Sequence, residues 1–174
     1  MLRTLSAVVL LVFSLSSYVL GGSPHTDLSM TGTVIAVVSG MEVDVMVTRS
    51  AVPEVAVPGT VVRVVYHGID APDRFDRLYM ETFDLNWKLT MEKEVYFDLA
   101  ETAWDDEHRL HAYAYLDPSG YGMINAFLLA SGLAEIDAEF DLCEPYASYL
   151  SGIAAIAKQS DLGIWADPDA PGDT

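Results

Sequence analysis

Cysteine, lysine and long apolar runs are scarce in this chain, and each scarcity excludes a class of protein. Cys143 is the only cysteine, so an intramolecular disulfide and CxxC zinc or redox sites are excluded. We expect Cys143 to be a small core residue rather than a nucleophile. The longest apolar run, from Leu5 to Leu20, spans about 16 residues and is shorter than the ~20 residues of a typical membrane span.

Basic residues are also few. Only nine Lys and Arg residues face 26 Asp and Glu residues, and the formal net charge is −17. Such a surface repels polyanions unless salt screens it or a local basic pocket overrides it. Duplex binding through a basic face is therefore excluded, and nucleic acid is disfavoured as a partner. A saline habitat and an ordinary solvated acidic surface both explain the acidity.

The N-terminal segment predicts export. Arg3 precedes the apolar run, and Gly21 or Ser23 ends a possible cleavage site, so residues 1–23 are predicted to be a secretory signal peptide. An uncleaved N-terminal anchor is the alternative, and no stable membrane span is expected beyond this segment. We expect a secreted or cell-envelope monomer. Its predicted parts after the signal are a linker over 24–30, a folded domain over 31–166 and a flexible tail over 167–174.

Hydrophobic patterning divides the folded domain into strands and helices. Segments rich in β-branched residues predict five strands, over residues 31–38, 43–48, 60–67, 94–99 and 109–116. Helical spacing predicts three helices, over residues 74–91, 124–130 and 144–159. Three strands, a helix, two strands and two helices suit a small five-stranded barrel capped by helices. The predicted class is α+β, mainly β.

Four stretches of this domain resemble motifs of the staphylococcal nuclease (thermonuclease) family. Residues 68–73 (Gly-Ile-Asp-Ala-Pro-Asp) match the family's G-[IV]-D-[AT]-P-E loop, and residues 108–116 resemble its Y-G-R-x-L-A-Y-V-Y strand. Residues 124–134 resemble V-N-x-x-L-[IV]-x-x-G-L-A, and residues 163–165 stand where the family has G-L-W. The motifs follow the family's order, and the resemblance implies an OB-fold barrel with about three helices.

The resemblance also implies calcium-dependent hydrolysis of nucleic-acid phosphodiesters. In such a site a hard cation polarises the phosphoryl oxygen, arginines stabilise the developing charge, and a carboxylate activates water. By position, the carboxylate of Asp70 and the backbone carbonyl of Ala71 would hold the metal. Asp73 would replace the general-base glutamate with a side chain one methylene shorter, and Arg109 would bind phosphate.

The chain departs from the family pattern at two charged positions. Met41 occupies the place of a metal-binding aspartate, and a thioether is a poor ligand for Ca²⁺. Glu42, one residue further, is the candidate replacement ligand. Val65 stands where the family has an arginine, while Arg63 lies two residues earlier on the same face of its strand. Arg63 either reaches the site or forms a salt bridge with local acids.

We therefore expect Ca²⁺ to bind weakly at most and nuclease activity to be weak or absent, because losing one preorganised charge stabiliser costs ~10²–10³ in rate. Glu107 adds negative charge beside Arg109, where a phosphate would pass. The acidic run 105–107 is predicted to be a solvated turn, with weak cation binding as the alternative. Tyr113 and Tyr115 are expected to pack rather than stack on bases, and Asn125 to be a structural hydrogen-bond partner. Packing roles are also expected for Trp87, Trp104 and Trp165.

Three functions stay open. The first is an exported, slow or altered phosphodiesterase that uses Asp70, Asp73, Arg109 and a displaced Arg63. The second is a non-catalytic OB-fold module that binds a peptide, a glycan or another ligand. The third is a nuclease-like fold kept as a structural domain of the cell envelope. Calcium-dependent cleavage of single-stranded DNA that is lost in Asp70→Asn would distinguish the first from the others.

Overall fold

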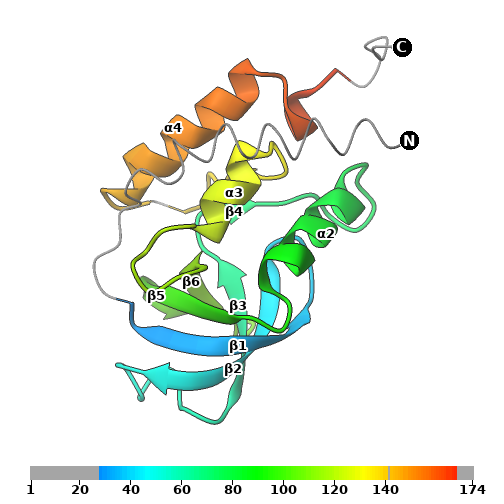
Figure 1. The fold of residues 1–174 in the computed structure, drawn as a ribbon. Coiled ribbons are helices and arrows are strands. Elements are labelled where there is room, and N and C mark those ends of the chain that lie inside the picture. The colour runs from blue at the N-terminus through cyan, green and yellow to red at the C-terminus, as the bar shows by residue number, and fades with distance from the viewer. Residues whose placement is uncertain (1–27, 141, 168–174) are drawn as a thin grey trace.

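A closed five-stranded barrel forms the body of the protein. The structure, a computed structural model, describes residues 28–140 and 142–167. The strands follow the order β1-β2-β3-β6-β5 around the barrel, and only β3 and β6 run parallel among these pairs (Figure 1). Their bounds are β1 Met30–Val37, β2 Glu42–Ser50, β3 Val61–Tyr66, β5 Glu94–Trp104 and β6 Leu110–Tyr115. The predicted α+β class with a five-stranded barrel is confirmed.

Helices cover one end of this barrel. The short helix α3 lies against β6 and also contacts α4. Helix α2 contacts β1 and α3 (Figure 1). A second, two-stranded sheet joins β4 to β7 and places Glu135 opposite Asp70. The bounds are β4 Ile69–Asp70, α2 Tyr79–Thr90, α3 Ile124–Ala130, β7 Glu135–Ile136, α4 Tyr146–Gln159 and the 3₁₀ turn Gly163–Trp165.

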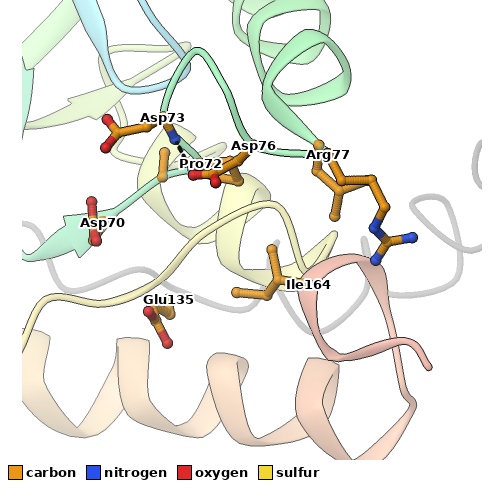
Figure 2. A pocket seen from close by; sticks show the side chains of 9 residues that line it. Asp70, Pro72, Asp73, Asp76, Arg77, Glu135 and Ile164 are labelled. Carbon is orange, nitrogen blue, oxygen red and sulfur yellow. Dashed lines mark hydrogen bonds between the residues drawn. The ribbon is translucent and has the colours of Figure 1, made fainter. Parts of the chain in front are cut away.

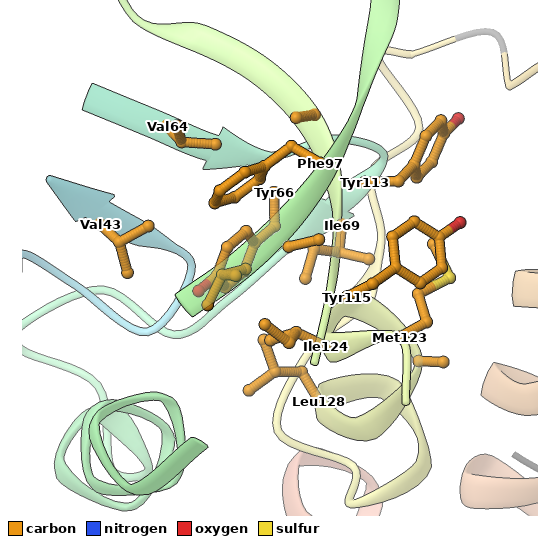
Figure 3. Close-up of a cluster of buried hydrophobic side chains, with 14 of the residues drawn as sticks. Val43, Val64, Tyr66, Ile69, Phe97, Tyr113, Tyr115, Met123, Ile124 and Leu128 are labelled. Atoms are coloured by element: carbon orange, nitrogen blue, oxygen red, sulfur yellow. The ribbon is translucent and has the colours of Figure 1, made fainter. Parts of the chain in front are cut away.

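Strict alternation in β2 decides which side chains fill the barrel. Val43 and Val45 point inward and are fully buried. Glu42 and Asp44, which alternate with them, face outward. Phe97, together with residues of β3, β6 and α3, completes a continuous apolar core (Figure 3). Because the inside of the barrel is apolar, the charged residues of β2 lie on its outer surface.

Asn86 ties α2 to the turn between β1 and β2. Its side chain is fully buried, its Nδ2 donates to the carbonyl of Ser39 at 2.9 Å, and its Oδ1 accepts from the Tyr66 hydroxyl at 2.8 Å. Burial raises the pKa of Tyr66, so this phenol stays a donor. A buried, hydrogen-bonded amide therefore anchors the turn that carries the candidate site residues 39–42.

Helix α2 starts later than its predicted range of 74–91. The amide of Asp73 donates to the Asp76 carboxylate at 2.8 Å, and the amide of Asp76 donates to the carbonyl of Asp73 at 2.8 Å. This side-chain turn competes with helical hydrogen bonding. The helix consequently begins at Tyr79.

Three other expectations are corrected. Strand β5 continues to Trp104 instead of ending at Leu99. The last helix begins at Tyr146, so Pro145 is its N-cap rather than part of its first turn. Cys143 is exposed and is not a core residue. Residues of all three corrected segments line the larger of the two clefts described below.

The predicted signal segment 1–23 and most of the linker and the tail lie outside the described residues. Within residues 28–140 and 142–167, no helix has the length and apolar character needed to cross a membrane.

Candidate functional site

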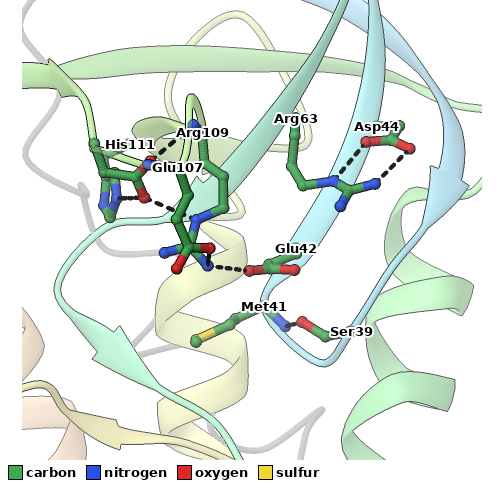
Figure 4. Close-up of polar contacts among 9 residues, drawn as sticks. Ser39, Met41, Glu42, Asp44, Arg63, Glu107, Arg109 and His111 are labelled. Atoms are coloured by element: carbon green, nitrogen blue, oxygen red, sulfur yellow. Dashed lines mark hydrogen bonds and ion pairs between the residues drawn. The ribbon is translucent and has the colours of Figure 1, made fainter.

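Arg109, just before β6, is surrounded by carboxylates. One terminal nitrogen, Nη1, lies 2.9 Å from Oε1 of Glu42 and 3.4 Å from Oε2 of Glu107. The Nε of Arg109 donates to Oδ2 of Asp105 at 2.7 Å (Figure 4). The hydrogen bond to Asp105 and the charges of all three acids raise the pKa of Arg109. The guanidinium is thus permanently charged, and an incoming phosphate has to compete with these carboxylates for it.

Asp105 organises the turn that presents Arg109. Its Oδ1 accepts the backbone amides of Glu107 at 3.0 Å and Arg109 at 2.8 Å, and its Oδ2 faces Nε2 of His111 at 3.1 Å. Desolvation opposes ionisation, but the hydrogen bonds from Arg109 and His111 outweigh it and hold the pKa of Asp105 below its usual range. The prediction of a solvated turn over 105–107 is therefore wrong for Asp105. An aspartate four residues before the arginine was the sequence signal for this role.

Glu42, the first residue of β2, contacts Arg109 across strand β3, which lies between β2 and β6. It pairs in register with Val65, which in turn pairs with His111 on β6, so β3 brings the ends of β2 and β6 to one place. Met41 packs against the core, and its amide donates to the Ser39 hydroxyl. The carboxylate predicted as a replacement metal ligand thus contacts a guanidinium instead, and its metal role stays a prediction.

Arg63 has a partner of its own. It stands opposite Asp44 in the β2–β3 register, with Nε 2.9 Å from Oδ1 and Nη2 3.1 Å from Oδ2 of that residue (Figure 4). The hydrogen bond to Asp44 raises the pKa of Arg63. Of the two alternatives for Arg63, the structure shows the salt bridge. Catalytic participation of Arg63 would require it to leave this bidentate pair.

Asp70, the last residue of β4, and Asp73, in the loop that follows, line an open cleft of about 310 Å³ (Figure 2). Glu135 from β7 lines the same cleft. Partial burial, followed by the charge of Asp137, raises the pKa of Asp70, and Glu135 and Asp73 add to this effect. The cleft therefore concentrates negative charge.

These two groups of predicted residues lie on either side of the β1–β2 turn. Asp70 and Asp73 line one cleft, and Arg109 lines another, of about 590 Å³. Gly40 of this turn lies against Ala71, because a Cβ on Gly40 would be 3.4 Å from the Cβ of Ala71. Glu42, at the other end of the turn, contacts Arg109. The structure thus places both groups beside one turn, with no direct bond between them among the described residues.

The donors at this place do not fit a strong calcium site. Ca²⁺ takes six to eight oxygen ligands. Asp70 and the carbonyl of Ala71 are available, but Met41 offers sulfur and Glu42 is bound to Arg109. Within the part of the chain that the structure describes, no group of three or more His, Cys, Asp or Glu residues is arranged to hold a metal ion.

A comparison with protein families assigns the chain. The family model described as staphylococcal nuclease homologue matches residues 63–167. The chain belongs to this family. The match includes Asp70, Asp73 and Arg109, but it begins after the turn that holds Met41 and Glu42. No curated protein matches the chain.

In this staphylococcal nuclease homologue, Asn125 is a structural residue, as predicted. Its Oδ1 accepts the amide of Ala114 at 3.1 Å, and its Nδ2 donates to the carbonyl of His67 at 3.0 Å. The side chain is fully buried. Asn125 therefore fixes α3 against the strand ends that flank the candidate site.

The aromatic residues of this nuclease homologue divide into two groups. Tyr115 is fully buried, and Tyr113 stacks on Tyr146 with ring centroids 3.6 Å apart, which confirms the predicted packing. Trp87 and Trp104 are 51% and 39% exposed, so the packing role expected for them is wrong. Trp104 instead lines the larger cleft.

Proposed function

We propose that this chain is an exported member of the nuclease family whose phosphodiesterase activity on nucleic acid is weak or absent. The observation that carries the proposal is the contact of Arg109 with three carboxylates within 3.4 Å. Family membership supports nucleic acid as the substrate class. Export is supported by the apolar character of residues 1–23, which resembles a signal peptide.

The chain keeps only part of the machinery for phosphodiester hydrolysis. Arg109 is the group that would stabilise charge on the phosphoryl oxygens, and Asp73 is the carboxylate that would accept a proton from the attacking water. A second arginine is replaced by Val65, which is 5% exposed and uncharged. Since one such stabiliser contributes ~10²–10³ in rate, this loss alone makes fast turnover implausible.

Cleavage of single-stranded DNA tests the activity directly. The chain without residues 1–23 is assayed with Ca²⁺ and with EDTA, at low and high salt, beside Asp70→Asn. We expect slow cleavage or none, and any cleavage to disappear in Asp70→Asn. Asp84→Asn, an equal charge change on the exposed face of α2, is the matched control. Fast cleavage by the unmodified chain would contradict the proposal.

Binding of an oligonucleotide tests the role of the carboxylates around Arg109. In EDTA, Glu42→Gln removes one negative charge beside the guanidinium. We expect affinity for fluorescent oligothymidylate to rise about tenfold or more, because a charge ~4 Å from a phosphate contributes ~1 kcal/mol in water and ~4 kcal/mol near a protein surface, and ~1.4 kcal/mol is tenfold. Glu54→Gln, in the exposed β2–β3 loop, is the control. Equal affinities in the two variants would refute this explanation and support the non-catalytic OB-fold module.

A further inference from the structure

The larger cleft, of about 590 Å³, is acidic. It opens beside Arg109, between strands β5 and β6 and the segment that precedes α4. Its carboxylates belong to Asp98, Glu101, Asp105 and Glu139. Among the described residues that line it, Arg109 alone carries a permanent positive charge, and its charge is already offset by neighbouring acids. The cleft therefore has a negative potential, which favours a cation.

Aromatic rings contribute the apolar surface of this cleft. Trp104 and Phe140 line the cleft and are 39% and 36% exposed, so their rings are open to a ligand. Phe140 meets the ring of His67 edge to face, with centroids 4.8 Å apart. Exposed rings next to carboxylates suit a cation that carries hydrocarbon, because an aromatic face attracts positive charge.

Two imidazoles, of the buried His111 and the half-buried His67, add unpartnered ring nitrogens to the cleft. His111 is 5% exposed, and its Nε2 lies 3.1 Å from the Asp105 carboxylate. Because that carboxylate is ionised and can only accept, Nε2 of His111 donates to it. Nδ1 of His111 and Nδ1 of His67 are both buried without a hydrogen-bond partner. Both rings line the cleft.

We propose that this cleft binds an organic cation, an alkylammonium or guanidinium group, either on a small molecule or on a Lys or Arg side chain of a partner. Carboxylates, unpartnered ring nitrogens and aromatic faces together accept such a donor-rich cation. A nucleotide fits poorly, since its phosphate would face the same carboxylates. The cleft shares Arg109 with the candidate nuclease site, but cation binding there does not require phosphodiesterase activity.

Calorimetry tests the proposal with three probes. Arginine methyl ester represents the free cation, a blocked Gly-Gly-Arg-Gly-Gly peptide represents the side chain, and thymidine monophosphate is the anionic comparison. We expect saturable one-to-one binding of at least one cation and none of the nucleotide. Stronger binding of the peptide would identify a side chain as the source, and stronger binding of the ester a small molecule. Binding of the nucleotide in preference to both cations would overturn the proposal.

Substitutions separate this cleft from the general attraction of an acidic protein for cations. Glu139→Gln and Trp104→Ala are each expected to weaken cation binding roughly threefold to tenfold. Glu54→Gln changes the charge equally outside the cleft and is expected to leave binding unchanged. Both cleft positions are partly or fully exposed, so circular dichroism should show intact folds. Equal losses in all three variants, or binding that never saturates, would refute a defined site.

Discussion

Replacing Asp105 by asparagine tests how the turn before β6 holds Arg109. The asparagine side chain would keep one carbonyl oxygen in the place of Oδ1, which accepts the amides of Glu107 and Arg109. Its amide nitrogen would replace Oδ2, which accepts from Nε of Arg109 and faces Nε2 of His111. The substitution therefore spares the backbone turn and removes the two side-chain interactions.

The expected cost follows from these lost contacts. A hydrogen bond to a charged group contributes about 1.5–3 kcal/mol, and a neutral one about 1 kcal/mol. The side chains of Arg109 and Asp105 are 30% and 22% exposed, so solvent screens the pair in part. We expect the free energy of unfolding to fall by about 2 kcal/mol near pH 7.

Urea denaturation measures this difference, with Asp106→Asn as the control because that neighbouring side chain is exposed. The pKa of Asp105 is lowered in the fold, so its contribution is complete above the unfolded pKa of about 3.9 and is lost as the pH falls through the lower, folded value. The gap between the native protein and Asp105→Asn should thus be constant from about pH 8 to 5 and shrink below pH 4. A gap no larger than that of Asp106→Asn would show that Asp105 does not organise the turn.

Three further outcomes are expected. Burial, with a smaller effect of His111, lowers the pKa of His67 to about 4. The unfolded pKa of His67 is about 6.5, so the free energy of unfolding should fall by ~1–2 kcal/mol, after solvent screening, as the pH drops from 6.5 to 4. Urea titrations of His67→Gln should no longer show this pH dependence. Asn125→Ala should lower the free energy of unfolding by about 2–3 kcal/mol, because it leaves a buried amide without its acceptor; a loss below about 0.5 kcal/mol would contradict this. Arg63→Gln breaks an exposed pair with Asp44, so urea curves should shift by less than ~1 kcal/mol and oligonucleotide affinity should stay within about twofold.

Strands and helices with a clear hydrophobic periodicity were predictable from the sequence. The alternating valines of β2 and the compact apolar run of α3 specify a face without help from distant residues, and the bounds of α3 were predicted correctly. The start of α2 was not, because a side-chain turn between Asp73 and Asp76 replaces the first helical turn. Local hydrogen bonding of this kind competes with periodicity and leaves little trace in it.

Sequence by itself determined the barrel class and the family, since strand order and four local motifs need no knowledge of contacts. Only the tertiary structure decided which carboxylate neutralises which arginine. Strand register sets Asp44 against Arg63, and the shared neighbour Val65 brings Glu42 to Arg109. Ion pairing depends on distances of a few ångströms between segments far apart in the chain, and these distances exist only once the barrel has closed.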